Sequence, residues 1–312
     1  MEGFFHRPVM CKEAVDSLNP RSGGIYIDGT IGGGGHSYEI MKRTAPDGIL
    51  IGIDKDEEAL AASEQRLKEF KTRVHLIQGN FSEIKVIIAN LHIENVDGIL
   101  IDLGVSSHQL DTASRGFSFS LDAPLDMRMD RRDALSAYGI VNDYPEDLLK
   151  RIVREYGEEM KASKIVRAIT ARRKIRPIQT TRELADIISS VIPKKGGPKK
   201  IHPATKTFQA LRIAVNDELA HLQTVITDGV DVLREGGRFS IISFHSLEDR
   251  IVKHLFREAE IGCVCPRDFP VCTCHRKKTL RVLTRRPIGA GDEEKAENPR
   301  ARSARLRTAE RV

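Results

Sequence analysis

The feature that most constrains the fold is an alternation of short apolar segments with helix-like segments in the first third of the chain. Each apolar segment ends in a turn, and the stretches that follow space their apolar residues to cover one face of a helix. Strands that alternate with helices form a parallel sheet with helices on both faces. The predicted strands are residues 24–30, 49–55, 74–80 and 96–105, with helices at 35–43 and 57–70.

The alternation stops after residue 105. Residues 106–133 are rich in turn formers, and helices are predicted at 145–156, 161–173 and 181–192 and from Ala204 towards Leu233. A buried strand follows at 239–244, and residues 279–287 are predicted to close the sheet as a hairpin. Too few strands follow residue 244 to build a second sheet. The order therefore favours one α/β domain, residues 1–111 and 214–312, interrupted by a helical insertion at 112–213.

Composition and charge indicate a globular protein with a polyanionic partner. Of 312 residues, 40% are hydrophobic and 30% are charged, which is typical of a soluble domain. The net charge of +6 includes an acid-free run at 161–182 with eight Lys or Arg, and the segment from Arg276 is again rich in arginine. Such runs favour phosphate binding, with a solvated helix face as the alternative. We expect a cytoplasmic protein with no membrane partner.

A glycine-rich loop after the first strand is typical of nucleotide binding. Asp28 ends the strand, and Gly32 to Gly35 precede a helix, so that a ligand can touch the backbone there. The spacing matches neither the G-x-G-x-x-G loop of dinucleotide enzymes nor a P-loop, which needs G-K-[ST]. It is similar to motif I of class I methyltransferases, in which the loop and a nearby acid hold the amino-acid half of S-adenosylmethionine.

The next two strand ends extend this cofactor hypothesis. Asp54 ends the second strand, at a position where a carboxylate accepts hydrogen bonds from both ribose hydroxyls. An ordinary turn residue is the alternative for Asp54 taken alone. Phe81 follows the third strand and is either an adenine-packing residue or a core phenylalanine.

At the end of the fourth strand the resemblance narrows to one family. Enzymes that methylate exocyclic amines often carry a D-P-P-Y-like motif there, and this chain keeps Asp102 but lacks the prolines and the tyrosine. The chain resembles the bacterial 16S ribosomal-RNA cytosine-N4 methyltransferase family (the MraW type). Matching segments cover nearly the whole chain in order: residues 26–30, 34–36, 102–107, 115–119, 124–130, 202–212, 243–250 and 298–303.

The resemblance implies a class I methyltransferase (Rossmann-like) α/β sheet with an inserted all-helical domain that recognises the substrate. It implies S-adenosylmethionine-dependent methylation of the exocyclic N4 of a cytosine in the decoding region of 16S ribosomal RNA, within the small ribosomal subunit. The cofactor contacts that it implies are Gly34, Gly35, His36, Asp54, Phe81, Asp102 and Gln109. A homodimer is left open.

The chemistry of this reaction points to the same strand end. The N4 lone pair is delocalised into the ring, so an enzyme must align the amine with the methyl group and accept a proton. Asp102 is the first choice for the acceptor, and Ser106 is placed to orient the amine. His245 is a candidate to line the pocket or relay the proton, with a structural histidine as the alternative. Phe117 and Phe119 are candidates to stack a flipped cytosine, unless they tie this loop to the insertion.

Four of the five cysteines lie within twelve residues near the C-terminus. This clustering fits metal ligands or reduced thiols better than a disulfide framework. Cys263, Cys265, Cys272 and Cys274 are candidate ligands of a structural zinc, although C-x-C pairs are tighter than the usual C-x-x-C knuckle. We assign them no catalytic role.

Two other functions compete with an RNA methyltransferase. A methyltransferase for a small molecule or a protein would explain the glycine loop and the strand-end acids, but not the basic insertion. An RNA-binding assembly factor without activity would explain the basic runs on a retained cofactor fold. Turnover with assembled subunits, naked RNA or neither distinguishes the three.

Overall fold

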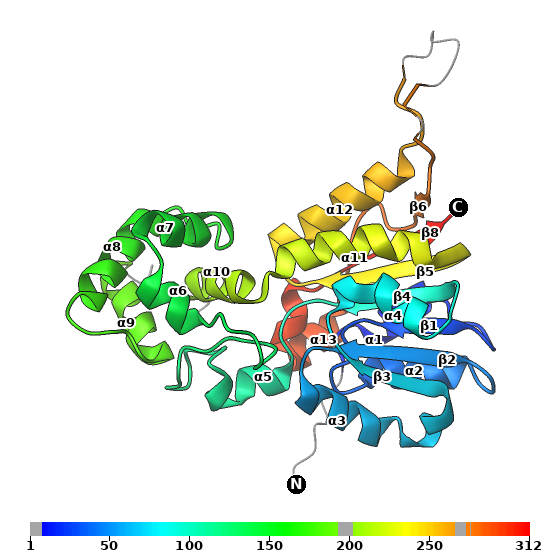
Figure 1. Cartoon of the computed structure of the whole chain (residues 1–312), viewed down its shortest axis with the longest axis horizontal. Coiled ribbons are helices and arrows are strands. Elements are labelled where there is room, and N and C mark those ends of the chain that lie inside the picture. The colour runs from blue at the N-terminus through cyan, green and yellow to red at the C-terminus, as the bar shows by residue number, and fades with distance from the viewer. Residues whose placement is uncertain (1–7, 193–201, 266–272, 275) are drawn as a thin grey trace. The chain divides into compact units, whose positions relative to one another are not determined.

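The computed structural model describes residues 8–192, 202–265, 273–274 and 276–312 (Figure 1). The chain divides into two compact units. Unit 1 comprises Met1–Gly104 and Leu219–Val312, and unit 2 comprises Val105–Glu218. No helix in the described part of the chain combines the length and the apolar content that a membrane crossing requires.

Unit 1 contains a mixed sheet, and it confirms the predicted Rossmann-like α/β class. Its strands are β1 (Ile25–Asp28), β2 (Ile49–Asp54), β3 (Val74–Gln78), β4 (Val96–Asp102), β5 (Leu233–Ser243), β6 (Leu280–Val282), β7 (Ile288–Gly289) and β8 (Arg305–Arg311). The order is β3-β2-β1-β4-β5-β8-β6, with β7 paired to β8. The first five strands in this order are parallel, and β8 is antiparallel to β5. The carboxyl ends of β1 to β5 therefore lie at one edge.

Both faces of this sheet are covered by helices. Successive strand residues point to opposite sides, so a strand that is apolar throughout needs packing partners on both faces. In β4, Ile99 and Ile101 belong to one buried cluster and Leu100 to another. The first cluster includes residues of α4 (Ile84–Asn90), α11 (Glu218–Val232) and α12 (Ser246–Glu260). The second includes residues of α1 (Cys11–Leu18) and α2 (Gly35–Arg43). Figure 1 shows these helices beside the sheet.

The predicted closing hairpin at residues 279–287 is wrong. This segment contributes β6, whereas the strand that pairs with β5 is β8 at the C-terminus. Arginines conceal β8 in the sequence, because a buried charge interrupts the apolar alternation of a strand. Arg307 is only 6% exposed, and its Nε donates to Asp249 Oδ1 at 2.7 Å.

The predicted continuous helix from Ala204 towards Leu233 is also wrong. The helix α10 (Thr205–Asn216) ends at Asp217, whose φ of 47° is left-handed, and α11 begins at the next residue. Aspartate is among the few residues that tolerate this conformation. The two units meet in the sequence at this break.

Unit 2 is built mainly from helices. They are α5 (Ser107–Asp111), α6 (Ala137–Asp143), α7 (Glu146–Glu155), α8 (Ala162–Arg173), α9 (Thr181–Val191) and α10. Their apolar faces form one buried cluster. Polar side chains fix the turn-rich segment before α6: Asn216 donates to Met127 O at 2.9 Å and accepts from Met129 N at 2.8 Å.

Candidate functional site

The glycine loop between β1 and α2 has a conformation that few other residues could adopt. Gly34 precedes α2 with φ 72°, and a Cβ there would lie 3.3 Å from Ser63 Cβ. A Cβ on Gly35 would lie 2.7 Å from Pro8 Cγ, which is closer than real contacts allow. The loop thus passes close to its neighbours and begins a helix whose first backbone N–H groups have no helical acceptors.

Asp28 at the end of β1 is an internal support for this loop. The side chain is 1% exposed, and its Oδ2 accepts a hydrogen bond from Ser37 Oγ at 2.6 Å while Oδ1 accepts from Thr30 N at 3.3 Å. Burial raises the pKa of Asp28 to about 6. The sequence motif contains this acid, but its bonds to Ser37 and Thr30 could not be predicted, because a strand-end acid gives no sign of which neighbours it contacts.

Asp54 at the end of β2 is tied to the same loop. Its Oδ2 accepts from Gly32 N at 2.9 Å, and its Oδ1 accepts from Asp56 N at 2.9 Å. Burial raises the pKa of Asp54 to about 6. A carboxylate oxygen has further acceptor capacity beyond one such bond. Asp54 therefore positions the glycine loop in addition to any contact with ribose hydroxyls, which stays a prediction.

Asp102 at the end of β4 has an oxygen that the protein leaves unused. Its backbone N–H donates to Thr30 Oγ1 at 2.6 Å, which joins the end of β4 to the loop after β1. The side-chain Oδ1 is buried and has no hydrogen-bond partner among the described residues. Burial raises the pKa of Asp102 well above its usual range, and the negative charges of Asp28, Glu248 and Glu294 add to the shift. Such an orphaned buried acceptor indicates a ligand position.

His36 lies beside Asp102 as a neutral side chain. It is 5% exposed, and its Nδ1 lies 3.9 Å from Asp102 Oδ2. The Nε2 is 3.0 Å from Val9 O; since a carbonyl only accepts, Nε2 carries the hydrogen and Nδ1 keeps its lone pair. Burial lowers the pKa of His36 to about 4. His36 thus presents an acceptor nitrogen beside the unused oxygen.

Phe81 follows β3 as the first residue of a short 3-10 turn that Asn80 and Glu83 cap. The ring is partly buried against the core of unit 1. These contacts are those of a core phenylalanine, and packing on an adenine stays a prediction.

Ser106 and Gln109 belong to unit 2, where they cap α5. Ser106 Oγ accepts from Gln109 N at 3.1 Å, and Gln109 Oε1 accepts from Ser106 N at 3.1 Å. This reciprocal pair is a capping box. The roles predicted for them, orienting the amine and contacting the cofactor, remain predictions beside this structural one.

His245 caps α12 in unit 1. Its Nδ1 accepts from Glu248 N at 3.4 Å, and Nε2 lies 3.0 Å from Glu248 Oε1. Glu248 Oε2 in turn accepts from Phe244 N at 2.7 Å and from His245 N at 3.1 Å. The Nδ1 contact agrees with the structural alternative for His245, whereas Nε2 is buried and makes no hydrogen bond with the described residues. The predicted part of His245 in proton transfer stays a prediction.

The two predicted stacking aromatics are packed inside unit 2. Phe117 is 7% exposed, and the ring of Phe119 stacks on His202 with centroids 4.6 Å apart and meets Phe208 edge-on at 5.0 Å. This favours their role in tying the loop to the helices.

The structure divides the basic run of residues 161–182 into two groups. Arg173 donates to the carbonyl oxygens of Val141 and Tyr144, each at 2.7 Å, and Arg172 pairs with Glu183 at 2.5 Å. Both therefore stabilise unit 2, which corrects the expectation that the whole run faces a ligand. The cations of the run that are exposed and form no ion pair with the described residues are Lys161, Lys164, Arg167, Lys174 and Arg182.

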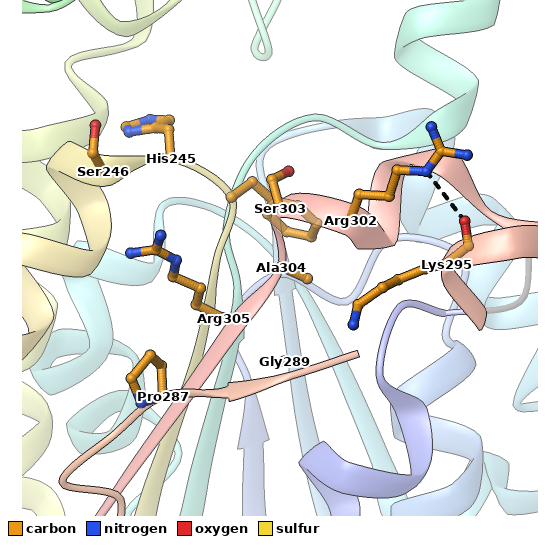
Figure 2. A pocket seen from close by; sticks show the side chains of 10 residues that line it. His245, Ser246, Pro287, Gly289, Lys295, Arg302, Ser303, Ala304 and Arg305 are labelled. Carbon is orange, nitrogen blue, oxygen red and sulfur yellow. Dashed lines mark hydrogen bonds between the residues drawn. The ribbon is translucent and has the colours of Figure 1, made fainter. Parts of the chain in front are cut away.

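A second cationic feature is a pocket in unit 1, here called the C-terminal basic pocket. It is lined by Phe244, His245, Ser246, Pro287, Gly289, Lys295, Arg302, Ser303, Ala304 and Arg305. Figure 2 shows Arg305 on the side of His245 and Ser246, with Lys295 and Arg302 on the opposite side. None of the lining residues is acidic. The sequence showed these C-terminal arginines but not that they enclose a pocket.

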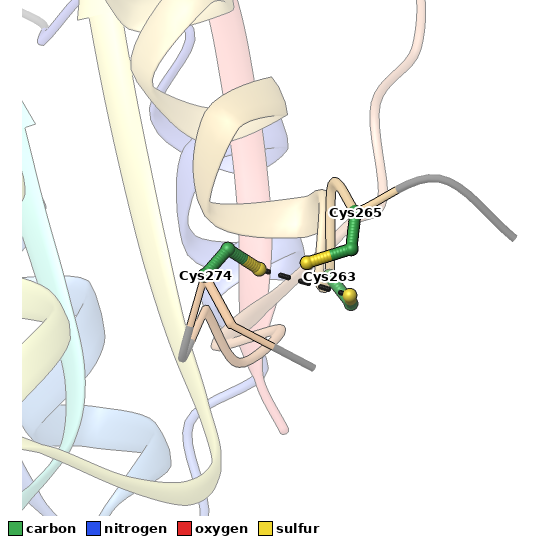
Figure 3. Close-up of side chains that lie close together, drawn as sticks. All are labelled: Cys263, Cys265 and Cys274. Atoms are coloured by element: carbon green, nitrogen blue, oxygen red, sulfur yellow. Dashed lines mark hydrogen bonds between the residues drawn. The ribbon is translucent and has the colours of Figure 1, made fainter. Parts of the chain in front are cut away.

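Three cysteines of unit 1 lie together after α12. The Sγ atoms of Cys263, Cys265 and Cys274 all lie within 4.8 Å of one another, and those of Cys263 and Cys274 are 3.7 Å apart (Figure 3). This separation is far too long for a disulfide bond. A hydrogen bond with Thr273 lowers the pKa of the Cys265 thiol. Cys272, the fourth predicted ligand, lies outside the described residues.

Comparison with known proteins gives consistent matches over the full length of the chain. The model of a family described as the MraW methylase family matches residues 3–312. The chain is 56% identical over 308 residues to a "Ribosomal RNA small subunit methyltransferase H" of Syntrophus aciditrophicus, covering 99% of this chain and 98% of that protein. Proteins of the same description from Trichlorobacter lovleyi (53% identity, 100% of each chain) and Geobacter sulfurreducens (53% identity, 99% of each chain) are similar to it.

Proposed function

Because the chain belongs to the MraW methylase family, we propose that it uses S-adenosylmethionine to methylate the exocyclic N4 of a cytosine in 16S ribosomal RNA. The full-length similarity to proteins described as small subunit methyltransferases supports ribosomal RNA as the substrate. The unpartnered Oδ1 of Asp102 at the carboxyl end of β4 is the observation that best supports methyl transfer at this position. The choice of N4 and of the decoding region rests on the family resemblance.

The residues around the glycine loop fit a cofactor with a nucleoside and a charged amino-acid half. S-adenosylmethionine would supply an activated methyl group on a positively charged sulfur. Gly34 and Gly35 allow close backbone approach, Asp54 offers acceptor capacity for hydroxyls, and His36 offers a neutral acceptor nitrogen. A nearby positive charge would lower the raised pKa of Asp102 and favour its carboxylate form.

In this proposal Asp102 is the residue that touches the reacting amine. Its Oδ1 accepts a hydrogen bond from the N4 amino group, aligns the nitrogen lone pair, and accepts the proton as positive charge develops. The bond from Asp102 N to Thr30 Oγ1 keeps the strand end in place during this step. Ser106, Gln109 and Phe81 are proposed as further contacts, carried over from the family.

The helical unit is proposed to hold RNA through its exposed cations. Lys161, Lys164 and Arg167 recur every third residue, so they share a face at the start of α8. Phosphate contacts of this kind release counterions and make affinity depend on salt.

The cysteine cluster is proposed to bind one structural zinc ion. Four thiolates at a Zn–S distance of about 2.3 Å around a tetrahedral ion lie roughly 3.8 Å apart. The 3.7 Å between the Sγ atoms of Cys263 and Cys274 matches this value. The ion would staple the connection between α12 and β6. The fourth ligand is proposed from the sequence to be Cys272, with the adjacent His275 as the alternative.

Replacement of Asp54 tests the cofactor site. Asp54→Ala is expected to weaken S-adenosylmethionine binding at least tenfold, because it removes a charge-assisted acceptor worth about 1.5–3 kcal/mol and an anchor of the loop. Calorimetry measures the affinity. Asp97→Ala is the matched control, since Asp97 accepts from Ile25 N at 2.7 Å at the opposite edge of the sheet. Equal affinity of the Asp54 variant and the wild type would contradict the role.

Replacement of Asp102 tests the chemistry. Asp102→Asn is expected to slow methylation by roughly 100-fold or more at saturating cofactor, the scale of a lost general base. The wild-type rate should rise with pH as Asp102 loses its proton, and this dependence should vanish in the variant. A near-normal rate would instead favour a backbone acceptor near Leu103.

The same pair of proteins tests the function in cells. Nucleoside mass mapping of 16S ribosomal RNA should show N4-methylcytidine when the wild type complements a strain that lacks the gene, and not when Asp102→Asn does. Turnover on assembled subunits or naked RNA separates RNA methylation from the two rivals. A mark that persists without the gene would refute the proposal.

The exposed cations of unit 2 are tested by a salt titration of RNA binding. Replacing Lys164, Arg167 and Lys174 by Gln removes up to three phosphate contacts, so the slope of log affinity against log salt should flatten by up to about 2–3. Arg173→Gln is the control: it should lower the unfolding temperature without changing this slope. An unchanged slope in the triple variant would mean a solvated helix face.

The zinc site is tested by metal analysis of the purified protein. About one zinc per chain is expected, and Cys263→Ser, Cys265→Ser and Cys274→Ser should each lose it. Cys11→Ser is the matched control, because Cys11 lies in α1 and outside the cluster. Cys272→Ser and His275→Gln identify the fourth ligand. Full zinc content in Cys274→Ser, or none in the wild type grown with zinc, would rule the site out.

A further inference from the structure

We propose that the C-terminal basic pocket binds a backbone phosphate of the RNA substrate close to the nucleotide that is methylated. This rests on the proposed function, because the substrate must be RNA. The pocket is formed by the residues that follow β5 and begin α12, by the strand β7, by the helix α13 (Asp292–Glu297), by the 3-10 turn Pro299–Ser303 and by the first residue of β8. All of these belong to unit 1.

The pocket lies at the edge of the sheet where β4 ends with Asp102, the residue proposed to contact the amine. Ile242 in β5 pairs with Asp102 in β4, and the pocket begins two residues later at Phe244. At about 3.3 Å per residue and 4.8 Å between strands, the Cα of Phe244 lies roughly 8 Å from that of Asp102. The ring of Phe244 also lies 3.4 Å from where a Cβ on Gly104 would be, just after Asp102. The lining of the pocket thus begins close to Asp102 at the same edge of the sheet.

The side chains of the pocket keep a positive charge despite their ion pairs. Arg305 donates to Asp249 Oδ2 at 3.1 Å, but the same carboxylate already accepts two bonds from Arg307, so one negative charge serves two arginines. The pairing lowers the pKa of Asp249, which keeps that carboxylate ionised. The side chain of Arg305 is 52% exposed. Its guanidinium is therefore held in place by Asp249, while its remaining N–H groups can donate to a ligand in the pocket.

The other two cations face Arg305 across the pocket. Arg302 donates from Nε to Lys295 O at 3.3 Å, which leaves the outer nitrogens of its guanidinium for a ligand. Lys295 pairs with Asp292 at 3.1 Å, but the side chain of Asp292 is fully exposed, and such surface pairs are weak. Ser246 and Ser303 add hydroxyl groups to the lining. Guanidinium and ammonium groups with hydroxyls are the donors that recognise phosphate.

A phosphate fits this pocket better than the carboxylate of the cofactor. The glycine loop that is proposed to hold the amino-acid half follows β1, and β4 separates β1 from β5 in the sheet. Phe244 and His245 therefore follow a strand that is not adjacent to β1, whereas Lys295 follows Glu294, which accepts from Met10 N at 2.8 Å, next to the Val9 carbonyl that contacts His36. An RNA strand whose target base lies at Asp102 has phosphates on both sides of that base, so one of them can meet the pocket.

The test replaces the two cations that do not support the fold. Lys295→Gln with Arg302→Gln should weaken binding to small ribosomal subunits, or to naked 16S ribosomal RNA, about tenfold and flatten the salt dependence by about one contact. Lys253→Gln with Arg257→Gln is the matched control, because it removes the same two charges from the exposed face of α12, outside the pocket. The control should bind as the wild type does.

The outcomes separate this inference from the proposed function. Weaker RNA binding with unchanged S-adenosylmethionine affinity supports the pocket, even if no methyl transfer to RNA is seen, in which case only the proposed function fails. Unchanged RNA binding in the pocket variant overturns the inference while methylation can still stand. Loss of S-adenosylmethionine affinity with normal RNA binding would assign the pocket to the cofactor and also overturn it.

Discussion

The parallel sheet brings three buried or partly buried carboxyl groups to one edge, and the rest of the site depends on this constraint. Asp28, Asp54 and Asp102 end three strands that pair directly in the order β2-β1-β4. Burial raises the pKa of all three. For Asp28 the change from 3.8 to about 6 amounts to a cost on the order of 3 kcal/mol at neutral pH. Because the pKa of Asp28 is raised in the folded protein, its contribution to the free energy of unfolding is fully present below the pKa of the unfolded chain. This contribution is lost as the pH rises through about 6.

The same carboxyl groups, held close together with raised pKa values, make a site that favours cations. The Oδ1 of Asp102 has no partner among the described residues: the Thr30 hydroxyl bonds to the Asp102 backbone and not to this oxygen, and His36 Nδ1 lies 3.9 Å from the other oxygen and carries no hydrogen. A ligand with a positive charge and N–H donors would relieve both the charge and the missing bond. The proposed cofactor has the charge, and the proposed amine has the donor. The same acids also hold the loop, so binding and loop geometry are coupled through Asp54.

The periodic part of the fold could be predicted from the sequence, and the partners of polar residues could not. The strands β1 to β4 and the helix α2 follow from apolar spacing and glycine position, because these signals are local. The strand β8 was missed because the ion pair of Arg307 with Asp249 joins residues 58 positions apart. The hydrogen bonds of Arg173 to Val141 and Tyr144 are equally invisible in a run that reads as uniformly basic.

The candidate site shows the same limit in another form. A strand that leads into a helix needs a polar side chain at the junction to satisfy the first backbone N–H groups. Ser106 before α5 and His245 before α12 both do this. Such a residue has a structural role, so its place before a helix is by itself no evidence of catalysis, and the roles predicted for Ser106 and His245 stay predictions. Asp102 Oδ1 caps no helix and has no hydrogen-bond partner among the described residues, and it shares the lack of a partner with His245 Nε2 and Thr207 Oγ1. For Asp102, a missing partner and a position at the end of a parallel strand coincide, and the missing partner is visible only in the structure.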